Sequence, residues 1–281
     1  MEKHTQKKVA VINDLSGYGR CSLTVAIPIL SAMRIQCCPV PTAILSNHTG
    51  FPVWFFDDYT DKMISYTDKW RELGLSFDGI VTGFLGSLEQ IEIVRGLLPS
   101  LSTDDTKLVV DPVMGDHGVL YPTYTEEMCE EIKALVSVAD LVTPNVTEAC
   151  ILTGTPYKET GFSRKELLNL AVMLRLMGAK SVIITGAREG VYYTNVVLER
   201  GQNEAEFVKM KSAGEGRPGT GDVFCSVAAG AYLSGKTPLQ AAEQAARFVR
   251  DCIARSEELE IPIENGVCFE ELLGKLIKSN P

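Results

Sequence analysis

Short apolar runs of strand length alternate with helical patterns through the first two thirds of this 281-residue chain. Because strands that alternate with helices pair in parallel and are covered on both faces, this order predicts an α/β fold around a mostly parallel sheet. The predicted strands are residues 9–12, 79–81, 108–110, 141–142 and 181–184, and the predicted helices are 19–33, 60–73, 87–98, 125–136, 146–153 and 163–177.

The order of elements changes after Gly186. A meander of three short strands is predicted there, followed by two long helices. Because no linker, repeat or low-complexity segment interrupts the chain, we predict a single domain over residues 1–281. The late strands are predicted at 191–193, 196–198 and 207–210, with a turn at 201–203, and the late helices at 220–234 and 238–256.

Composition excludes several classes of protein. The chain is 45% hydrophobic, enough for a large core, and carries a net charge of −9. An acidic chain is a poor broad surface for nucleic acid, although backbone amides can still form a local anion pocket. No apolar run approaches the roughly 18 residues of a membrane span.

The eight cysteines show no Cys-x-x-Cys spacing, and the chain has only three histidines. A zinc site is therefore not expected. The N-terminal residues lack an apolar signal region, so we expect reduced thiols in a cytoplasmic protein.

Polar or small residues follow each predicted strand of the parallel part. In open α/β sheets, ligands bind at the carboxyl ends of the strands. Five such ends in register favour a binding site along one edge of the sheet. They are Asn13-Asp14, Thr82-Gly83, Asp111-Pro112, Thr143-Pro144-Asn145 and Thr185-Gly186.

A Gly-Thr-Gly-Asp segment at 219–222 precedes an uncharged run from Val223 to Gly235. One interpretation is a glycine-rich helix start with Asp222 as a cap. The other is an anion hole made by the amides of Gly219, Thr220 and Gly221, with Asp222 as a general base. The uncharged run favours the second, because the start of a buried helix faces protein or ligand rather than water.

Two acidic segments follow predicted strands. The segment 111–116 holds Asp111 and Asp116, which suit either a solvated turn or a Mg²⁺ site. In the segment 143–148, Asn145 and Glu148 have the spacing of a capping box, which is compatible with metal binding.

A polar cluster, Ser46, Asn47, His48 and Thr49, is a candidate for binding a polar ring. The aromatic residues at 51–56 fit a core better than a ring-stacking site.

Two further glycine patterns have little weight. The segment 214–219 matches the dinucleotide-binding spacing, but Pro218 interrupts it and no βαβ unit follows. The segment 230–237 matches a P-loop, but only 44 residues remain after Thr237. We interpret it as a helix end at Gly235 and a new helix start at Thr237-Pro238.

The segments 46–49, 111–116, 143–148 and 219–222 together resemble the vitamin kinases of the ribokinase superfamily. Within them the pyridoxal/pyridoxine/pyridoxamine kinases match best, over residues 9 to about 256. Looser matches are Tyr18-Gly19 and the segment 83–87.

The resemblance implies a ribokinase-like three-layer sandwich, ATP as the donor, Mg²⁺, a monovalent cation and a homodimer. The reaction implied is phosphorylation of the hydroxymethyl group of a B6 vitamer. The roles implied are catalysis for Gly219, Thr220, Gly221 and Asp222, metal and phosphate contacts for Asp111, Asp116 and Glu148, ATP contacts for Thr143, Asn145, Thr185 and Gly186, and substrate binding for Asp14, Ser46, Asn47, His48, Thr49 and Phe84.

Two positions depart from the pattern of these kinases. Asp14 stands where many have Ser, and Phe84 where they have a ring-stacking Tyr. A carboxylate at Asp14 favours a cationic substituent on the substrate, unless Asp14 only caps the following turn. Hydroxymethylpyrimidine kinases, the alternative, often have Cys in place of Asp222. A vitamer-binding protein without catalysis would need no base there.

Overall fold

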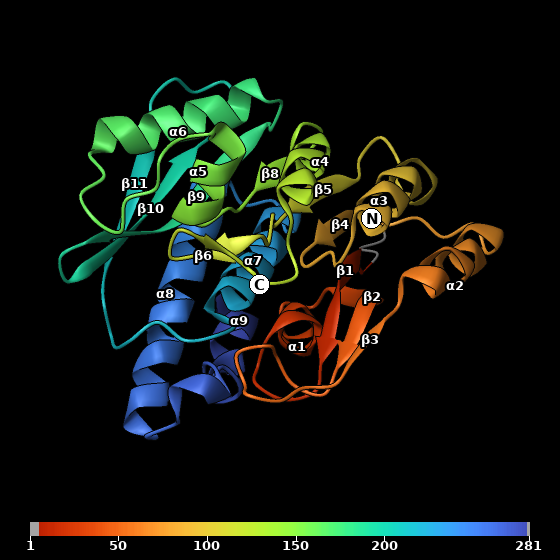
Figure 1. Cartoon of the computed structure of the whole chain (residues 1–281), viewed down its shortest axis with the longest axis horizontal. Coiled ribbons are helices and arrows are strands. Elements are labelled where there is room, and N and C mark those ends of the chain that lie inside the picture. The colour runs from red at the N-terminus through yellow and green to blue at the C-terminus, as the bar shows by residue number, and fades with distance from the viewer. Residues whose placement is uncertain (1–5, 280–281) are drawn as a thin grey trace.

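The computed structural model describes residues 6–279 of the chain. Within them, one nine-stranded sheet runs in the order β11-β10-β9-β8-β5-β4-β1-β2-β3 (Figure 1). Its strands are β1 (Lys8–Ser16), β2 (Gln36–Leu45), β3 (Phe56–Asp58), β4 (Gly79–Thr82), β5 (Lys107–Val110), β8 (Leu141–Val142), β9 (Ser181–Glu189), β10 (Tyr192–Leu198) and β11 (Glu206–Lys211).

The six central strands from β9 to β2 pair in parallel, and β3, β10 and β11 are antiparallel additions at the edges. The chain starts in the middle of the sheet at β1, moves outward to β2, and then returns to β4 on the other side. The strand order therefore reverses between β1 and β4. In sheets of this kind, ligands bind outside the carboxyl ends of the strands at such a reversal.

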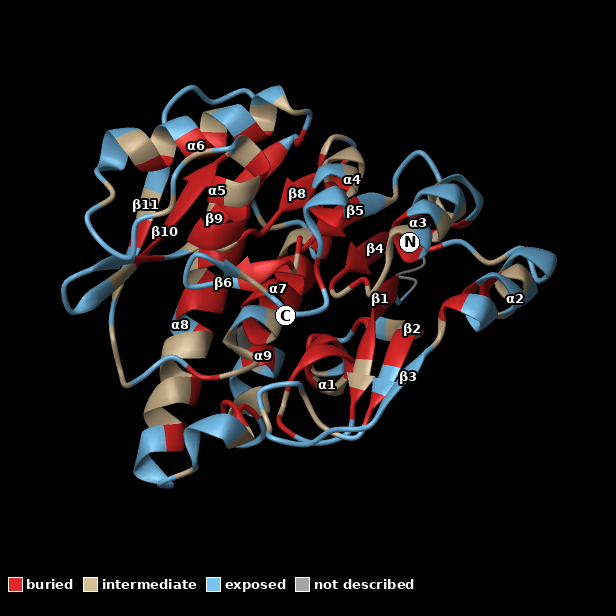
Figure 2. Cartoon of the chain, in the orientation of Figure 1, coloured by how far each residue is buried: buried red, intermediate tan, exposed pale blue. Residues whose placement is uncertain are grey.

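Helices cover both faces of the sheet, as the strand alternation requires (Figure 2). On β1, Ala10 and Ile12 pack into one core with α2–α6, and Val9 and Val11 pack into the other with α1, α7, α8 and α9. The predicted three-layer α/β fold is confirmed. The helices are α1 (Ser22–Ala32), α2 (Thr60–Glu72), α3 (Leu88–Leu101), α4 (Glu126–Val136), α5 (Val146–Thr153), α6 (Arg164–Leu176), α7 (Thr220–Leu233), α8 (Pro238–Glu258) and α9 (Leu273–Ser279).

Several boundaries differ from the sequence prediction. The first strand continues through Asp14 to Ser16, and β9 continues through Gly186 to Glu189, so these polar residues lie within strands. The runs at 191–193 and 196–198 form the single strand β10, apart from Val191. The helix predicted from Gly19 begins at Ser22.

Strand β2 was not predicted, and its two prolines explain why. Pro39 and Pro41 cannot donate to a ladder, which argues against a central strand. In the fold, β2 is hydrogen-bonded along its length only to β1, and β3 pairs with it only at Ala43, Ile44 and Leu45. The prolines therefore lie where one edge of β2 is unpaired.

The interpretation of the P-loop-like segment is confirmed. Gly230 lies inside α7, Gly235 ends that helix with φ +93°, and Thr237 caps α8 with Pro238 in its first turn. The eight cysteines are free thiols. In the part of the chain from residue 6 to 279, no helix is long and apolar enough to cross a bilayer.

A buried glutamine joins three elements near the site. The side chain of Gln90 on α3 donates to Thr42 O and Thr60 Oγ1, both at 2.8 Å, and accepts from the Gly86 amide at 2.7 Å. We expect Gln90→Leu to lower the free energy of unfolding by about 2 kcal/mol or more, because it leaves buried polar groups unpaired. Urea denaturation would measure this, with Glu92→Leu on the exposed face of α3 as control. Equal midpoints for the two variants would contradict the expectation.

Candidate active site

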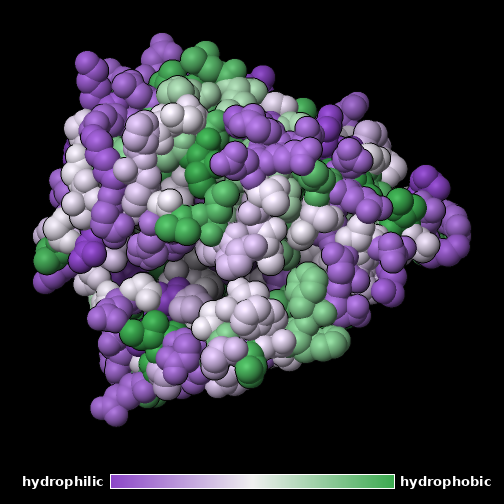
Figure 3. Space-filling model, in the orientation of Figure 1, coloured by the Kyte–Doolittle hydropathy of each residue, from purple (hydrophilic) through white to green (hydrophobic). Residues whose placement is uncertain are grey.

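The polar strand ends that the sequence marked converge at the carboxyl edge of the sheet. The start of α7 lies there with the ends of β1, β4, β5 and β8. The surface seen in Figure 3 is hollowed close to the place that α7 and the β6 strand (Gly115–Asp116) occupy in Figure 1. Ten of the fourteen α7 residues are buried, so the amides at its start are held rigidly at this edge.

The glycine-rich turn before α7 leaves open backbone donors. Gly219 has φ +79°, and a Cβ at this position would lie 1.8 Å from the carbonyl oxygen of Arg20. A Cβ on Gly221 would meet nothing within 4 Å, and among residues 6–279 no acceptor is found for the Gly221 amide. Unpaired amides at a helix start attract anions. The turn is therefore suited to hold a phosphoryl group.

Asp222 lies in the first turn of α7, beside these amides. Its carboxylate faces the side-chain amide of Asn13, with Nδ2 3.5 Å from Oδ1, and it accepts a hydrogen bond from the backbone of Ser22. Burial, reinforced by the charge of Asp14, raises the pKa of Asp222 to about 7. A carboxylate with a pKa near neutrality can accept a proton during a reaction.

Asn13 orients this carboxylate and was noted only as a strand end in the sequence. Its Oδ1 accepts from the amides of Phe84 (2.8 Å) and Asp14 (3.0 Å), so its Nδ2 must turn toward Asp222. A Cβ on Gly83 would lie 2.4 Å from the Asn13 side chain. The glycine after β4 therefore makes room for Asn13.

Asp14 is buried inside β1, where the register with β2 shifts. Its Oδ2 accepts from Ser16 Oγ at 2.7 Å, and the Ser22 hydroxyl also donates to it. Burial raises its pKa. Since β1 continues to Ser16, Asp14 does not cap a turn after the strand; it links the strand to the start of α1.

The predicted substrate cluster is held mainly by its own loop. Ser46 Oγ accepts from the Phe55 amide, and Asn47 Nδ2 donates to Val53 O. Both ring nitrogens of His48 contact the main chain: Nδ1 accepts from Gly50 N, so Nε2 carries the proton and donates to Glu264 O. His48 thus fixes the loop, while Thr49 is exposed.

Two buried carboxylates lie beyond Asp222 on the predicted metal side. Asp111 accepts from Thr143 Oγ1 at 3.2 Å and from the Cys225 thiol. Burial and the charge of Asp222 raise the pKa of Asp111 to about 8. Glu148 accepts from Met114 N and Asn145 N, and burial and the charge of Asp111 raise its pKa.

The capping box predicted for Asn145 and Glu148 is present. Asp116 is exposed on the β6–β7 hairpin, whose second strand is Val119–Leu120. Among residues 6–279, no group of three His, Cys, Asp or Glu side chains is placed to hold a metal ion. The three predicted carboxylates do not form a complete protein cage.

The residues predicted for nucleotide contact also lie together. Asn145 forms an isolated bridge with Thr185, and the Thr185 amide donates to Pro144 O. Gly186 has φ +77° and donates to Asn195 Oδ1 at 3.2 Å. Neighbouring strands β8 and β9 therefore bring Thr143, Asn145, Thr185 and Gly186 to one place.

Tyr121 is a site residue that the sequence did not reveal. The residue is 37% exposed, and partial burial with the charges of Glu148, Asp116, Asp222 and Asp111 raises the pKa of its phenol well above the usual range. The β6–β7 hairpin, which has no signal in the sequence pattern, brings this ring to the carboxylates.

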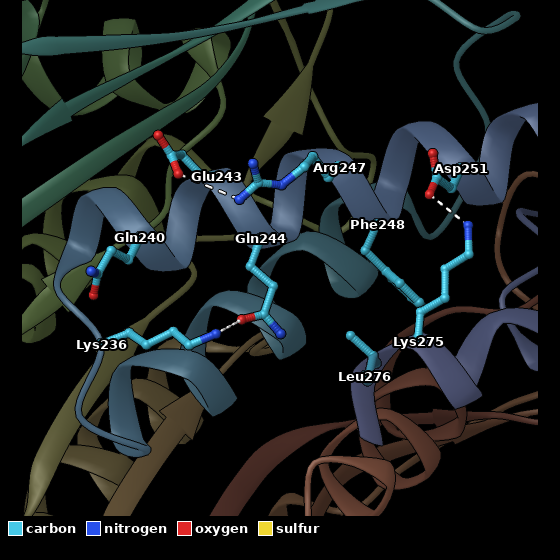
Figure 4. A pocket seen from close by; sticks show the side chains of 9 residues that line it. All are labelled: Lys236, Gln240, Glu243, Gln244, Arg247, Phe248, Asp251, Lys275 and Leu276. Carbon is cyan, nitrogen blue, oxygen red and sulfur yellow. Dashed lines mark hydrogen bonds and ion pairs between the residues drawn. The ribbon is translucent and has the colours of Figure 1, made fainter. Parts of the chain in front are cut away.

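A second hollow lies elsewhere. Figure 4 shows a groove of about 360 Å³ between α8 and α9, with Phe248 on its wall and the ion pairs Glu243–Arg247 and Asp251–Lys275 along it. None of the predicted site residues lines this groove, so it is separate from the candidate active site.

Comparisons with known proteins show the family to which the chain belongs. Residues 29–266 match the phosphomethylpyrimidine kinase family. The chain is 34% identical to the hydroxymethylpyrimidine/phosphomethylpyrimidine kinase of Aquifex aeolicus, over 64% of this chain and 69% of the relative. It is 27% identical to the pyridoxine/pyridoxal/pyridoxamine kinase of Bordetella pertussis, over 86% of each.

A solved structure from Bacteroides thetaiotaomicron, assigned to the phosphomethylpyrimidine kinases and crystallised with pyridoxal, superposes with a TM-score of 0.91. It is 39% identical and covers 97% of this chain and 96% of its own. The chain therefore belongs to the phosphomethylpyrimidine kinase family, and the resemblance to vitamin kinases is confirmed.

The carboxylates of this site give a pH-dependent stability. Among residues 6–279, Asp14, Asp111, Glu148 and Asp222 have no Lys or Arg ion pair. A carboxyl whose pKa is raised in the fold binds its proton more tightly there than in the unfolded chain. Its contribution to stability is present below about pH 4 and is lost as the pH rises through about 8 for Asp111.

We therefore expect Asp111→Asn to be more stable than the wild type at pH 8, by more than about 1 kcal/mol in metal-free buffer, and about equal at pH 4. Chemical denaturation of both proteins between pH 4 and 9 measures the difference, which includes the relief of Glu148 from the charge of Asp111. A difference that does not change with pH would contradict the burial argument.

Proposed function

We propose that this chain transfers a phosphoryl group from ATP to the hydroxymethyl group of a B6 vitamer, namely pyridoxal, pyridoxine or pyridoxamine. The observation that carries the proposal is the arrangement at the start of α7. A carboxylate with a pKa near 7, Asp222, lies beside open amides of a glycine-rich turn. A base next to an anion hole suits transfer of a phosphoryl group to an alcohol.

Each residue has a distinct part in this reaction. Asp222 accepts the proton of the vitamer hydroxyl as the oxygen attacks, and Asn13 and the Ser22 amide hold the carboxylate in place. The amides of Gly219 and Gly221 stabilise charge on the transferred phosphoryl oxygens, whereas the Thr220 amide already donates to Arg217 O. Because phosphoryl transfer depends mainly on positioning and electrostatics, no covalent step on the protein is needed.

The buried carboxylates suit cations. Asp111 and Glu148 have raised pKa values and repel each other, and a cation between them would relieve that repulsion. They would hold Mg²⁺, with water completing its shell, and Thr143 and Thr185 stand nearby for a monovalent cation. Bound Mg²⁺ neutralises charge on the phosphates. Thr143, Asn145, Thr185 and Gly186 would contact the nucleotide.

The choice of vitamer rests on two supports. The Bordetella relative is a B6 kinase by name, and the Bacteroides structure was crystallised with pyridoxal. Asp222 also departs from the Cys that hydroxymethylpyrimidine kinases often have. The second candidate, phosphorylation of hydroxymethylpyrimidine, is favoured by the family match and by the Aquifex relative.

We further propose a homodimer. The expectation that the aromatic residues at 51–56 enter the core is wrong for Trp54, Phe55 and Phe56, which are exposed. With Ile44 and Val53 they form an apolar patch at the β3 edge of the sheet. Apolar patches of this kind mark interaction sites. A second copy seated on this edge would cover them, and sedimentation of the protein would reveal it.

Release of ADP in the presence of Mg²⁺, measured with pyridoxal, pyridoxine, pyridoxamine and hydroxymethylpyrimidine in parallel, tests the function. We expect at least one B6 vitamer to be phosphorylated with a higher kcat/KM than hydroxymethylpyrimidine. Turnover confined to the pyrimidine would establish the second candidate, and ATP left intact in all four reactions would contradict both.

Asp222→Asn should fold normally and lose kcat by roughly 10²–10⁴-fold, as removal of a general base does. Nucleotide affinity should change little, because the turn amides remain. Steady-state kinetics with the preferred substrate measures the loss, and Glu215→Gln in the preceding exposed loop serves as control. A near-normal kcat in Asp222→Asn would refute the role of base.

Asp14 should set the preference among vitamers. A buried carboxylate without a cationic partner favours a substrate with a protonated amine, and such a hydrogen bond contributes about 1.5–3 kcal/mol. Asp14→Ser should therefore lower the ratio of kcat/KM for pyridoxamine to that for pyridoxal by roughly 10- to 100-fold. Asp14→Asn, of equal size but without charge, should do the same. An unchanged ratio with lower stability would mean that Asp14 only supports Ser16 and Ser22.

A further inference from the structure

The segment after α8 meets three loops of the candidate site that are far apart in the sequence. Residues 261–266, here called the clasp, include the short 3-10 helix η1 (Ile263–Asn265) and end at Gly266. Four of their carbonyl oxygens accept hydrogen bonds from side chains of other loops. The donors are Arg217, His48 and Arg20.

Arg217 joins the clasp to the glycine-rich turn at residues 219–221, here called the anion-binding turn. Its side chain is buried, and its Nη1 donates to Ile261 O at 2.7 Å and Pro262 O at 3.3 Å. Its Nη2 pairs with Glu257 at 2.8 Å. Its own carbonyl accepts from the amide and hydroxyl of Thr220, the first residue of α7. The contacts that hold the guanidinium of Arg217 therefore also hold its main chain, and through it the start of the turn.

Arg20 joins the clasp to the loop between β1 and α1. Its Nη1 donates to Asn265 O at 3.1 Å, and its Nε pairs with Glu270 at 2.7 Å. The backbone packs closely here, since a Cβ on Gly266 would lie 2.3 Å from Gly19 O. A Cβ on Gly219 would lie 1.8 Å from the carbonyl oxygen of Arg20, so this loop also packs against the anion-binding turn.

His48 joins the clasp to the loop that holds the predicted substrate residues 46–49, here called the substrate loop. Its Nε2 donates to Glu264 O at 2.8 Å, and its ring occupies the space where a Gly19 side chain would lie. The substrate loop, the β1–α1 loop and the anion-binding turn thus share one support, and they touch one another.

We propose that the clasp fixes these three loops relative to one another, and that Arg217 and Arg20 are positioning residues for the phosphoryl transfer. The kinetic part of this inference rests on the proposed function, whereas the structural coupling does not. Loosening one attachment should loosen loops that the removed side chain never touches.

Hydrogen exchange of the full-length protein tests the coupling without any assay of activity. Arg217→Met should speed exchange of the amides at residues 48–51, which Arg217 does not contact, as well as those at 220–223. Arg20→Met should speed exchange at 220–223. Arg255→Met is the matched control, because Arg255 lies at the same end of α8 as Glu257, the partner of Arg217, and among residues 6–279 its side chain pairs only with Glu258 and Glu271.

Faster exchange confined to the loop that lost its arginine, or equal to that of the control, would overturn the proposal. Circular dichroism verifies the fold of each variant. If Arg217→Met does not fold, the exchange of residues 220–223 in Arg20→Met still tests the coupling. Arg20 is partly exposed, so its replacement is expected to leave the fold intact.

Kinetics tests the positioning role. Each single variant should lose about 10-fold or more in kcat, since small displacements at a reacting centre are costly. The double variant Arg20→Met/Arg217→Met should lose less than the product of the single losses, because both act through one support. A full product of losses would overturn the shared support. A wild type that phosphorylates none of the vitamers would refute the proposed function and leave the exchange result standing.

Discussion

The burial of α7 is the constraint on which the rest of the structure depends. A helix without charge from Val223 to its end can be enclosed between the sheet, α1 and α8, and enclosure fixes where its first turn points. That turn lies at the carboxyl edge, where the strand order reverses. The amides of the turn and the carboxylate of Asp222 take their positions from this one packed element.

The same edge gathers four buried or partly buried carboxylates that have no Lys or Arg ion pair within the described part of the chain, and this arrangement opposes folding. Burial of charge is unfavourable unless it is compensated, so these groups hold their protons at higher pH than usual. Their retention is easier to understand as a demand of function than of stability. Cations and protons are the natural complements of such a cluster of carboxylates, which indicates a site that is completed by its ligands.

Much of the fold could be predicted from periodicity, and much of the site from residues at strand ends. The parallel core and the helix bounds, including Val146–Thr153, follow from local patterns. The β2 strand could not be predicted, because its prolines argue against a strand unless one of its edges is known to be unpaired. The roles of Asn13 and Tyr121 could not be predicted either. The orientation of the Asn13 amide and the nearness of the Tyr121 phenol to carboxylates both result from tertiary contacts. His48 was predicted from its type and neighbours, but its contact with Glu264 lies 216 residues away.

The clasp has a consequence for how members of this family exchange parts. The family match ends at residue 266, the last residue of the clasp, so the whole clasp lies within the matched region. Chimeras that import a substrate loop from a relative would place a foreign side chain against a native Glu264 carbonyl. Such a loop should therefore transplant well only if it brings its own donor at position 48, because the Glu264 carbonyl would otherwise lose this hydrogen bond.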